Sequence, residues 1–299
     1  MNNPTSPNDL SSPLGPPIDD AEAEALKASV AATWAAKSGA WTRWADYMAE
    51  LAVYFNTPLL DAAAIASGQR VLDLASGVGE PSLDIARRVA PDGSVTATDL
   101  VPEMLATARQ RATDAGLANI DFKIADMEAL PFADAAFDRV TCRFGLMFSP
   151  RVVAALGQAL RVLKPGGRAG FLVWGPIEDN TMFAVVQSVI PAFVEKPPFN
   201  AHLTPFRFAA EGDLAAAMTA AGFTDVVESE RRFEPQPPAG VQFWRQNLEM
   251  SLGTICDGLA ADRRAALDAA IERAFEPYRD VDGYRLAAQI RIGTGVAPD

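Results

Sequence analysis

From about residue 70 onward, short apolar runs alternate with amphipathic segments. Each apolar run has the length of a buried strand, and glycine, proline or acidic residues bound it. The expected strands cover residues 71–74, 94–98, 120–124, 137–144 and 169–174. Helices are expected to begin near Pro81, Pro102 and the pair Ser149 and Pro150, because proline suits the first turn of a helix. This alternation predicts βαβ units and a doubly wound, largely parallel α/β sheet.

The chain before residue 69 follows a different pattern. Residues 1–19 are rich in proline, asparagine and serine, and we expect a disordered tail or an extended arm packed on the domain. They lack the positive start and apolar run of a secretory signal, so a cytoplasmic protein is expected. Residues 20–68 show a helical pattern that is broken near Gly39 and at Pro58. Four aromatic residues of this segment either pack in the core or form a flap over a ligand site: Trp34, Trp41, Trp44 and Tyr47.

Residues 69–175 carry the strand–helix alternation and are expected to bind the ligand, and residues 176–210 interrupt it. The interruption is rich in phenylalanine and proline and contains Phe183, Phe199 and the only histidine, His202. We expect it to form a helical cap over the carboxyl ends of the strands, where such sheets bind ligands. Residues 211–299 resume the fold, with a helix at 211–221, a strand at 224–229, helical stretches at 240–256 and 260–277, and a final strand at 284–292.

Composition and charge exclude several classes of function. The chain has 26 Lys and Arg against 38 Asp and Glu, and its net charge of −12 opposes binding to a nucleic-acid backbone. Two distant cysteines and one histidine do not make a zinc site, so no metal is expected. No apolar run is long enough to span a membrane. Oligomeric state is not readable from the sequence.

The loop after the first strand carries the strongest chemical signal. The strand ends in the acid Asp73, and Ala75, Ser76, Gly77 and Gly79 follow before a helix starts. Small residues let a ligand approach the backbone closely. The bare amides and the helix N-terminus favour an anionic group, whereas an acid favours an ammonium group. Together they match a zwitterionic amino-acid moiety.

The next two strands also end in acids. Asp99 closes the second strand and is placed to accept hydrogen bonds from ribose hydroxyls. Asp126 follows the third strand and can accept from an exocyclic amine, while the Met127 amide can bond a ring nitrogen of adenine. An amino acid, a ribose and an adenine in a row describe S-adenosylmethionine.

These motifs make the chain resemble the class I S-adenosylmethionine-dependent methyltransferases, near the small-molecule branch of ubiquinone and menaquinone biosynthesis. The matching text, in family order, is 71–80, 98–105, 126–132, 137–140 and 161–167. The resemblance implies a sheet in the order 3-2-1-4-5-7-6 with strand seven antiparallel. It also implies cofactor contacts from the residues above, from Leu100 and Met104, and from Arg143 at the methionine carboxylate. Ala75 stands where the family has its first loop glycine.

Two other functions are also compatible with these motifs. A nicotinamide-dependent dehydrogenase also uses a glycine loop and a later acid, but its third glycine position is Ser82 here. A protein that binds S-adenosylmethionine without catalysis is the other. For the enzyme, we expect a small, aromatic or quinone-like apolar acceptor, methylated at oxygen or carbon. His202 is either the general base or an ordinary surface or packing histidine.

Overall fold

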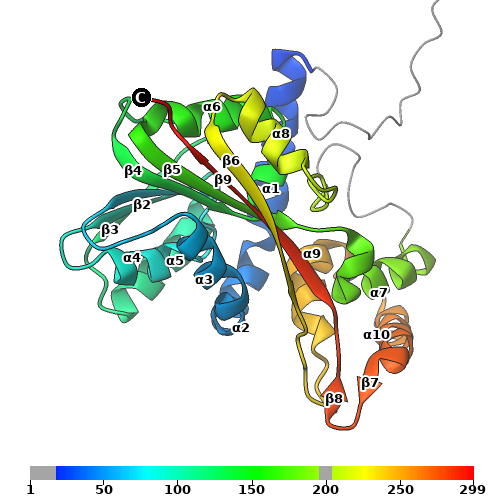
Figure 1. Cartoon of the computed structure of the whole chain (residues 1–299). Coiled ribbons are helices and arrows are strands. Elements are labelled where there is room, and N and C mark those ends of the chain that lie inside the picture. Colours follow the sequence, from blue (N-terminus) through cyan, green and yellow to red (C-terminus); the bar gives the residue numbers. More distant parts are fainter. Residues whose placement is uncertain (1–17, 195–203) are drawn as a thin grey trace, which may run out of the picture.

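Seven strands form one sheet, in the order β3-β2-β1-β4-β5-β9-β6 (Figure 1). The computed structural model describes residues 18–194 and 204–299. Strands β1 to β5 are parallel, and β9 pairs antiparallel with both β5 and β6. The expected order 3-2-1-4-5-7-6 with an antiparallel seventh strand is therefore confirmed. The strands are β1 (Arg70–Leu74), β2 (Ser94–Asp99), β3 (Ile120–Ile124), β4 (Phe137–Arg143), β5 (Leu163–Trp174), β6 (Thr224–Phe233) and β9 (Ala288–Val296).

Helices cover both faces of the sheet. On one face lie α3 (Ala52–Ala62), α4 (Ser82–Val89) and α5 (Pro102–Asp114), and on the other α6 (Val152–Val162) and α8 (Asp213–Ala220) (Figure 1). Each helix turns an apolar stripe to the sheet. In α5, for example, Leu105, Ala108 and Ala112 are buried at helical spacing. None of the helices within residues 18–194 and 204–299 is long and apolar enough to cross a membrane.

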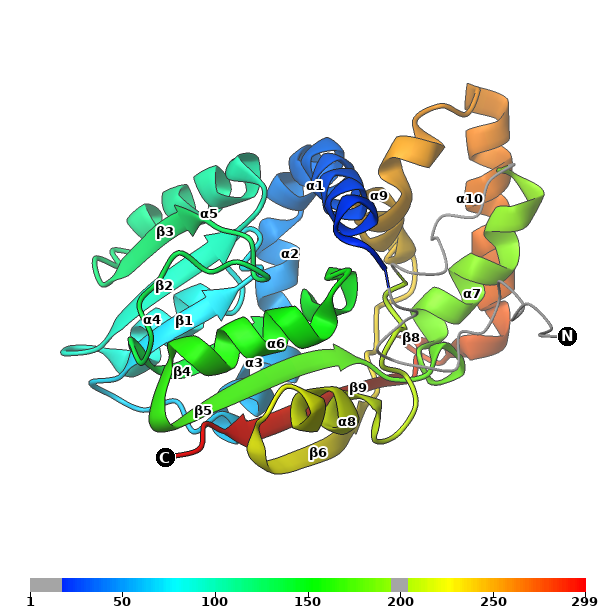
Figure 2. The ribbon, with the colours of Figure 1, turned by 90° about the horizontal axis from the view of Figure 1, so that it is seen from above.

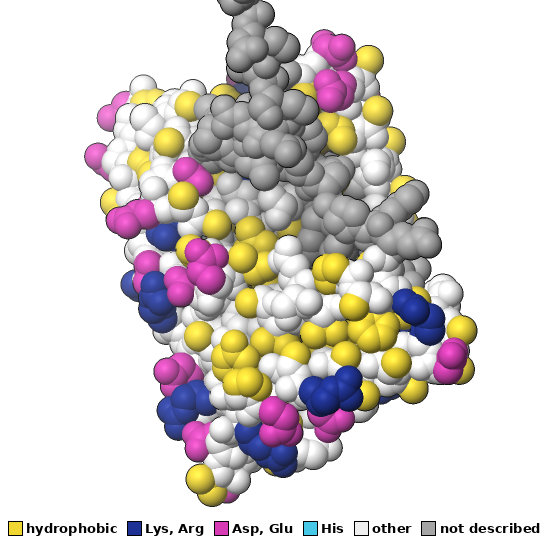
Figure 3. Space-filling view, turned by 90° about the vertical axis from the view of Figure 1, so that its right-hand side faces the viewer, with side chains coloured by type: hydrophobic (Ala, Val, Ile, Leu, Met, Phe, Trp, Pro, Cys, Tyr) yellow, Lys and Arg dark blue, Asp and Glu magenta, His cyan; other side chains and the backbone are white. Residues whose placement is uncertain are grey.

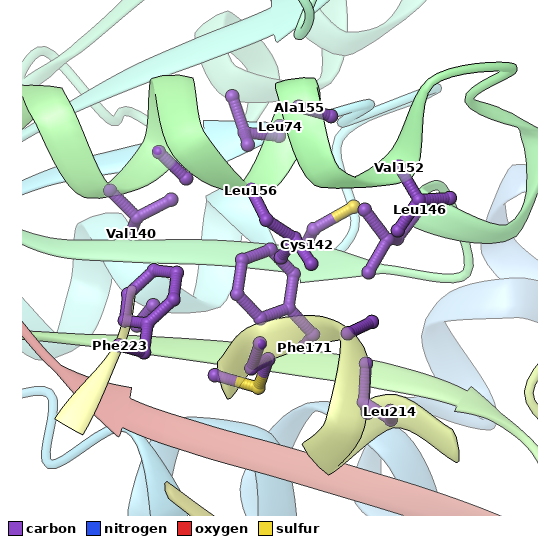
Figure 4. Close-up of a cluster of buried hydrophobic side chains, with 14 of the residues drawn as sticks. Leu74, Val140, Cys142, Leu146, Val152, Ala155, Leu156, Phe171, Leu214 and Phe223 are labelled. Atoms are coloured by element: carbon purple, nitrogen blue, oxygen red, sulfur yellow. The ribbon is translucent and has the colours of Figure 1, made fainter. Parts of the chain in front are cut away.

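The largest hydrophobic core lies between α6, α8 and the centre of the sheet (Figure 4). Leu156 of α6, Phe171 of β5 and Leu214 of α8 meet there and are fully buried. Burying such side chains contributes about 1.5–3 kcal/mol each relative to exposure. This packing fixes the ends of β4 and β5 and, with them, the loops that follow the strands.

A second, smaller core joins three helices beyond the sheet. Helices α7 (Thr181–Val189), α9 (Trp244–Cys256) and α10 (Ala261–Phe275) pack around Trp244 and Phe275 with β8 (Gly283–Tyr284), which pairs with β7 (Arg279–Asp280). Helix α1 (Asp20–Arg43) lies between this group and the sheet with its helices (Figure 2). On the side that carries α7 and α10, basic and acidic side chains are interspersed among hydrophobic ones (Figure 3).

The two expected breaks in the N-terminal helices are wrong. Helix α1 continues through Gly39 to Arg43, and Pro58 lies inside α3. An interior glycine costs a helix only about 1 kcal/mol, which the packing of α1 against α5 and α9 outweighs. The buried Phe55 and Leu59 similarly hold α3 to the sheet on either side of Pro58.

Two other expected boundaries also shift. Ser149 does not cap α6, because its hydroxyl donates to Glu128 at 2.7 Å and Arg151 takes the N-cap position. The final strand begins at Ala288 rather than at residue 284, because the Tyr284 amide bonds to the carbonyl of Pro237. The expected tail up to residue 17, and the expected site residues Phe199 and His202, lie outside the described residues.

Candidate functional site

A cavity of about 300 Å³ lies at the carboxyl ends of β1 to β4, beneath α1. This volume is at the lower end of the range for small-molecule sites. The loops after the strands form one wall, and α1, α7 and α9 contribute to the other. Both walls together form the lining of the cavity, called the wall below. The expected site residues that line it are Trp34, Trp41, Ala75, Ser76, Gly77, Asp99, Leu100, Met104, Asp126, Met127, Arg143 and Phe183.

Two expected aromatic residues do not reach the wall, because α1 ends before them. Trp44 is the C-cap of α1, and Tyr47 lies on the next helix, α2 (Ala45–Glu50). The spacing of three that linked them to Trp41 therefore does not continue along one helix. Trp44 Nε1 instead donates to Glu249 of α9 at 2.9 Å, which ties the two helices together.

Asp73 lies beneath the wall and does not line the cavity. The side chain is fully buried, and the hydroxyls of Ser82 and Thr141 both donate to its carboxylate. Burial raises the pKa of Asp73 to about 6, although these hydrogen bonds and Arg143 oppose the rise. Because its oxygens face the two hydroxyls, Asp73 ties β1, β4 and the start of α4 together. The expected contact of Asp73 with an amino-acid end stays a prediction.

The loop after β1 contains three residues with positive φ. Ala75, Gly77 and Gly79 have φ values of +52°, +51° and +110°. Gly79 does not reach the wall, and its backbone packs so closely on Leu83 that a Cβ would come within 3.2 Å of that side chain. The Ser76 hydroxyl is buried on the wall without a hydrogen-bond partner in the described part of the chain. The loop therefore presents backbone and one free hydroxyl to the cavity.

Asp99 is fixed at the end of β2 by the same loop. Its Oδ2 accepts from the Gly77 amide and its Oδ1 from the Val101 amide, both at 2.9 Å. Burial raises the pKa of Asp99, and these backbone hydrogen bonds oppose the rise. A carboxylate has about four acceptor positions. Asp99 therefore keeps acceptor capacity for hydroxyl groups of a ligand in the cavity.

Arg143 presents a buried, incompletely bonded guanidinium at the end of β4. The residue is 7% exposed, and its Nε and Nη1 have no hydrogen-bond partner among the described residues. The neighbouring acid Glu80 is occupied, since it accepts from Asn56 at 2.7 Å and from Arg111 at 3.0 Å. Burial lowers the pKa of Arg143, while Glu80 and Asp73 oppose that change. Unpaired buried donors are costly, so an anionic ligand group is the expected partner.

The acid expected at the adenine, Asp126, is engaged by α1. Lys27 Nζ lies 2.7 Å from Asp126 Oδ2, 2.5 Å from Glu24 and 3.4 Å from Glu128. Burial alone lowers the pKa of Lys27, but the hydrogen bonds to Asp126 and Glu24 raise it overall. The N-terminal half of α1 is thus clamped by ion pairs over the end of β3.

Aromatic rings also line the cavity. The rings of Phe144 and Trp174 stack with centroids 4.2 Å apart, and Phe183 meets Trp174 edge-on at 4.9 Å. Trp34 of α1 packs edge-on against Phe148 at 5.2 Å. These rings give the cavity an apolar face that suits a planar, apolar group.

Sequence reasoning missed the lysine on the inner face of α1 and the whole contribution of α9. Lys37 lies on the wall together with Trp34 and Trp41. It follows Trp34 by three residues and precedes Trp41 by four. That helical spacing could have revealed it. Helix α9 contributes Asn247, Met250 and Ser251 to the wall, and no local pattern in the sequence indicates this long-range contact.

A family model and curated relatives match part of the chain. Residues 71–167 match the family described as methyltransferase domain. A ubiquinone/menaquinone biosynthesis C-methyltransferase of Pseudomonas putida is 46% identical over 136 residues, which cover 45% of this chain and 53% of that protein. The chain therefore spans about half the length of the curated relatives it matches.

Two crystal structures share the fold. The YcgJ protein of Bacillus subtilis has a TM-score of 0.55 at 19% identity and covers 81% of this chain and 97% of its own. A putative methyltransferase of Bacillus halodurans has a TM-score of 0.54 at 23% identity, covering 81% and 98%. The matched residues contain β1 to β4 and the loops that line the cavity. Residues 71–167 are thus a methyltransferase domain of class I, the class that the sequence motifs had indicated.

Proposed function

We propose that the chain transfers a methyl group from S-adenosylmethionine to a small aromatic or quinone-like acceptor. The observation that carries this proposal is the composition of the cavity wall. The unpaired guanidinium of Arg143 and the carboxylate of Asp99 line the same cavity as the stacked rings of Phe144 and Trp174. A polar, charged ligand and an apolar ring can therefore meet within one enclosure.

The residues present fit the cofactor. Arg143 would hold its carboxylate, and the free hydroxyl of Ser76 and the loop backbone lie on the same wall. Asp99 would accept from its ribose hydroxyls. Asp126 and Met127 would contact its adenine after the ion pair between Lys27 and Asp126 breaks. When bound, S-adenosylmethionine supplies a methyl group on an electrophilic sulfonium.

The rest of catalysis requires alignment more than chemistry from the protein. Holding an acceptor atom in line with a bound electrophile can supply about 7–11 kcal/mol of barrier lowering. The aromatic rings and α1 would exclude water and orient the acceptor ring. His202 remains our prediction for a base if the acceptor must lose a proton.

The acceptor class rests on two observations. The aromatic face of the cavity suits a planar ring, and the Pseudomonas putida relative carries a name that states C-methylation in quinone biosynthesis. We therefore favour methylation of a carbon or an oxygen on an aromatic or quinone-like ring. The match covers about half of that relative, so the proposal does not extend to its exact substrate.

A titration of the purified chain with S-adenosylhomocysteine and, separately, NAD tests the proposal. We expect binding of the first and none of the second, because Ser82 stands at the third glycine position of the dinucleotide-binding fingerprint. Asp99→Ala should weaken binding by about ten- to a hundredfold, since a hydrogen bond to a charged group contributes roughly 1.5–3 kcal/mol. Asp121→Ala is the matched control, because Asp121 lies on β3 of the same sheet but does not line the cavity.

Turnover distinguishes the enzyme from a non-catalytic binder. Methyl transfer from labelled S-adenosylmethionine to aromatic or quinone-like acceptors supports the proposal. Tight NAD binding without S-adenosylhomocysteine binding would overturn it. Cofactor binding with no transfer to any acceptor of this class would favour a regulatory binding protein instead.

A further inference from the structure

Lys37 places a buried ammonium on the cavity wall without an acid to neutralise it. The residue is 8% exposed, and its Nζ lies 5.2 Å from the centre of the Trp34 ring. The other basic residues of the described wall have acids nearby: Lys27 pairs with Asp126, and Arg143 lies close to Glu80. No carboxylate of the described chain lies within ion-pair distance of Lys37.

A cation in this position is unfavourable as it stands. Removing a charge from water costs several kcal/mol unless a partner of opposite charge replaces the lost hydration. Burial accordingly lowers the pKa of Lys37 to about 8, and no acid opposes the change. The contact with Trp34 offsets only part of the cost. An anionic oxygen entering the cavity would supply the missing partner.

Lys37 occupies a different part of the wall from the proposed carboxylate site of the cofactor. Lys37 lies on α1 with its Nζ 5.2 Å from the centre of the Trp34 ring, whereas the Arg143 guanidinium lies at the end of β4, 5.9 Å from the centre of the Phe144 ring. Lys37 lies instead in the seam between α1 and α9, where Trp41 Nε1 donates to the carbonyl of Met250 at 3.2 Å. The residues proposed to hold the cofactor lie at or just after the ends of β1 to β4, so this seam is the part of the cavity that remains for the acceptor.

We infer that Lys37 is a specificity-determining residue that binds an anionic oxygen, a carboxylate or a phenolate, on the aromatic methyl acceptor. The inference rests on the proposed function and narrows its substrate class. The ammonium would hold the charged oxygen while Trp34 packs beside the ring, which sets the orientation of the ring toward the methyl donor. Neutral aromatic molecules would lack this anchor.

The test uses the full chain saturated with S-adenosylhomocysteine and two matched pairs of probes. Benzoate against benzamide reports on a carboxylate, and 4-nitrophenolate against nitrobenzene reports on a phenolate. We expect the anion of at least one pair to bind about tenfold or more tightly than its neutral partner, as a charged hydrogen bond predicts. The pair that shows the preference identifies which source of the anionic oxygen the site takes.

Lys37→Met should abolish the preference, Lys37→Arg should restore part of it, and all variants should bind S-adenosylhomocysteine with unchanged affinity. Lys123→Met is the control, because Lys123 is exposed and lies off the wall. Equal binding of both members in both pairs, or a preference that survives in Lys37→Met, overturns the inference. Failure of the parent chain to bind S-adenosylhomocysteine would instead overturn the proposed function, so the two failures are distinguishable.

Discussion

The two halves of α1 meet the cavity in opposite ways. In the N-terminal half, Lys27 is surrounded by three carboxylates, and Arg151 adds a hydrogen bond to Glu128 at 2.9 Å. In the C-terminal half, Lys37 is equally buried but faces aromatic rings and no acid of the described chain. The protein neutralises the first lysine itself and leaves the second for a ligand.

A structural lysine and a ligand-directed lysine differ in their charged neighbours. Composition and helical spacing do not distinguish the two residues, since both lie on the inner face of one helix. Their pKa values do, because hydrogen bonds raise that of Lys27 and burial lowers that of Lys37 to about 8. The same substitution at the two positions should therefore have opposite effects on stability.

The largest effect is expected for Lys27→Met. Removing one partner from a buried ion pair costs roughly 3–5 kcal/mol. Glu128 keeps Ser149 and Arg151 as donors, so we expect a loss at the lower end of this range, about 3 kcal/mol, in urea unfolding at pH 7. A free energy of unfolding equal to that of the parent would show that the ion pairs do not hold α1 in place.

Lys37→Met should act in the other direction. Each unit of pKa depression corresponds to about 1.4 kcal/mol, so removing the uncompensated charge should stabilise the ligand-free chain by about 1–3 kcal/mol at pH 7. The methionine keeps most of the apolar stem that packs near Trp34. Destabilisation by Lys37→Met would mean that the ammonium has a partner in the free protein, and the contrast between the two lysines would fail.

The pH dependence of stability sharpens the same contrast. Between the folded pKa of Lys37, about 8, and the ordinary lysine pKa near 10.4, the unfolded chain binds more protons than the folded one. Stability from Lys37 should therefore rise with pH in this window, by at most about 1.4 kcal/mol per pH unit.

Other groups titrate in the same range, so a difference curve is needed. Burial raises the pKa of Cys142 to about 12, and its contribution to stability falls as pH rises from 9 to 12. Subtracting the curve of Lys37→Met from that of the parent removes this common contribution. A difference curve that is flat between pH 8 and 10 would contradict the burial of an unpaired Lys37.

The smallest effect is expected at the exposed edge of the ion-pair cluster. Asp20 lies 2.5 Å from Arg151, but its side chain is 95% exposed. Such surface pairs contribute less than about 0.5 kcal/mol and weaken with salt. Asp20→Asn should therefore change thermal unfolding little at low salt and not at all at 1 M salt. A loss comparable to that of Lys27→Met would show that the cluster acts as one unit.

The sequence predicts well what depends on neighbouring residues. Strands β1 to β5 follow from local apolar runs, and acids stand at or just after the ends of β1 to β3. Asp99 and Asp126 reach the cavity because parallel strands end at one edge. Arg143 reaches it for the same reason. The resemblance to a known family supplied the antiparallel seventh strand, which no local pattern specifies.

What the sequence does not predict depends on long-range packing. Asp73 has the residue type and place of a ligand contact, but its carboxylate accepts from hydroxyls of α4 and β4 and does not line the cavity. Trp44 and Tyr47 leave the wall because α1 ends at Arg43. Whether Lys37 has an acid nearby depends on the elements that pack around it. The sequence does not show this, because α1 and α9 are far apart in the chain and meet only in the fold.

A crystal structure of the chain with S-adenosylhomocysteine would locate the cofactor site. We predict the ligand in the cavity beneath α1, with its carboxylate at Arg143, its ribose at Asp99 and its adenine at Asp126, which no longer pairs with Lys27. We also predict that Lys37 remains free of the ligand and open to the acceptor. A ligand bound elsewhere, or bound with Arg143 still unpaired, would contradict the account.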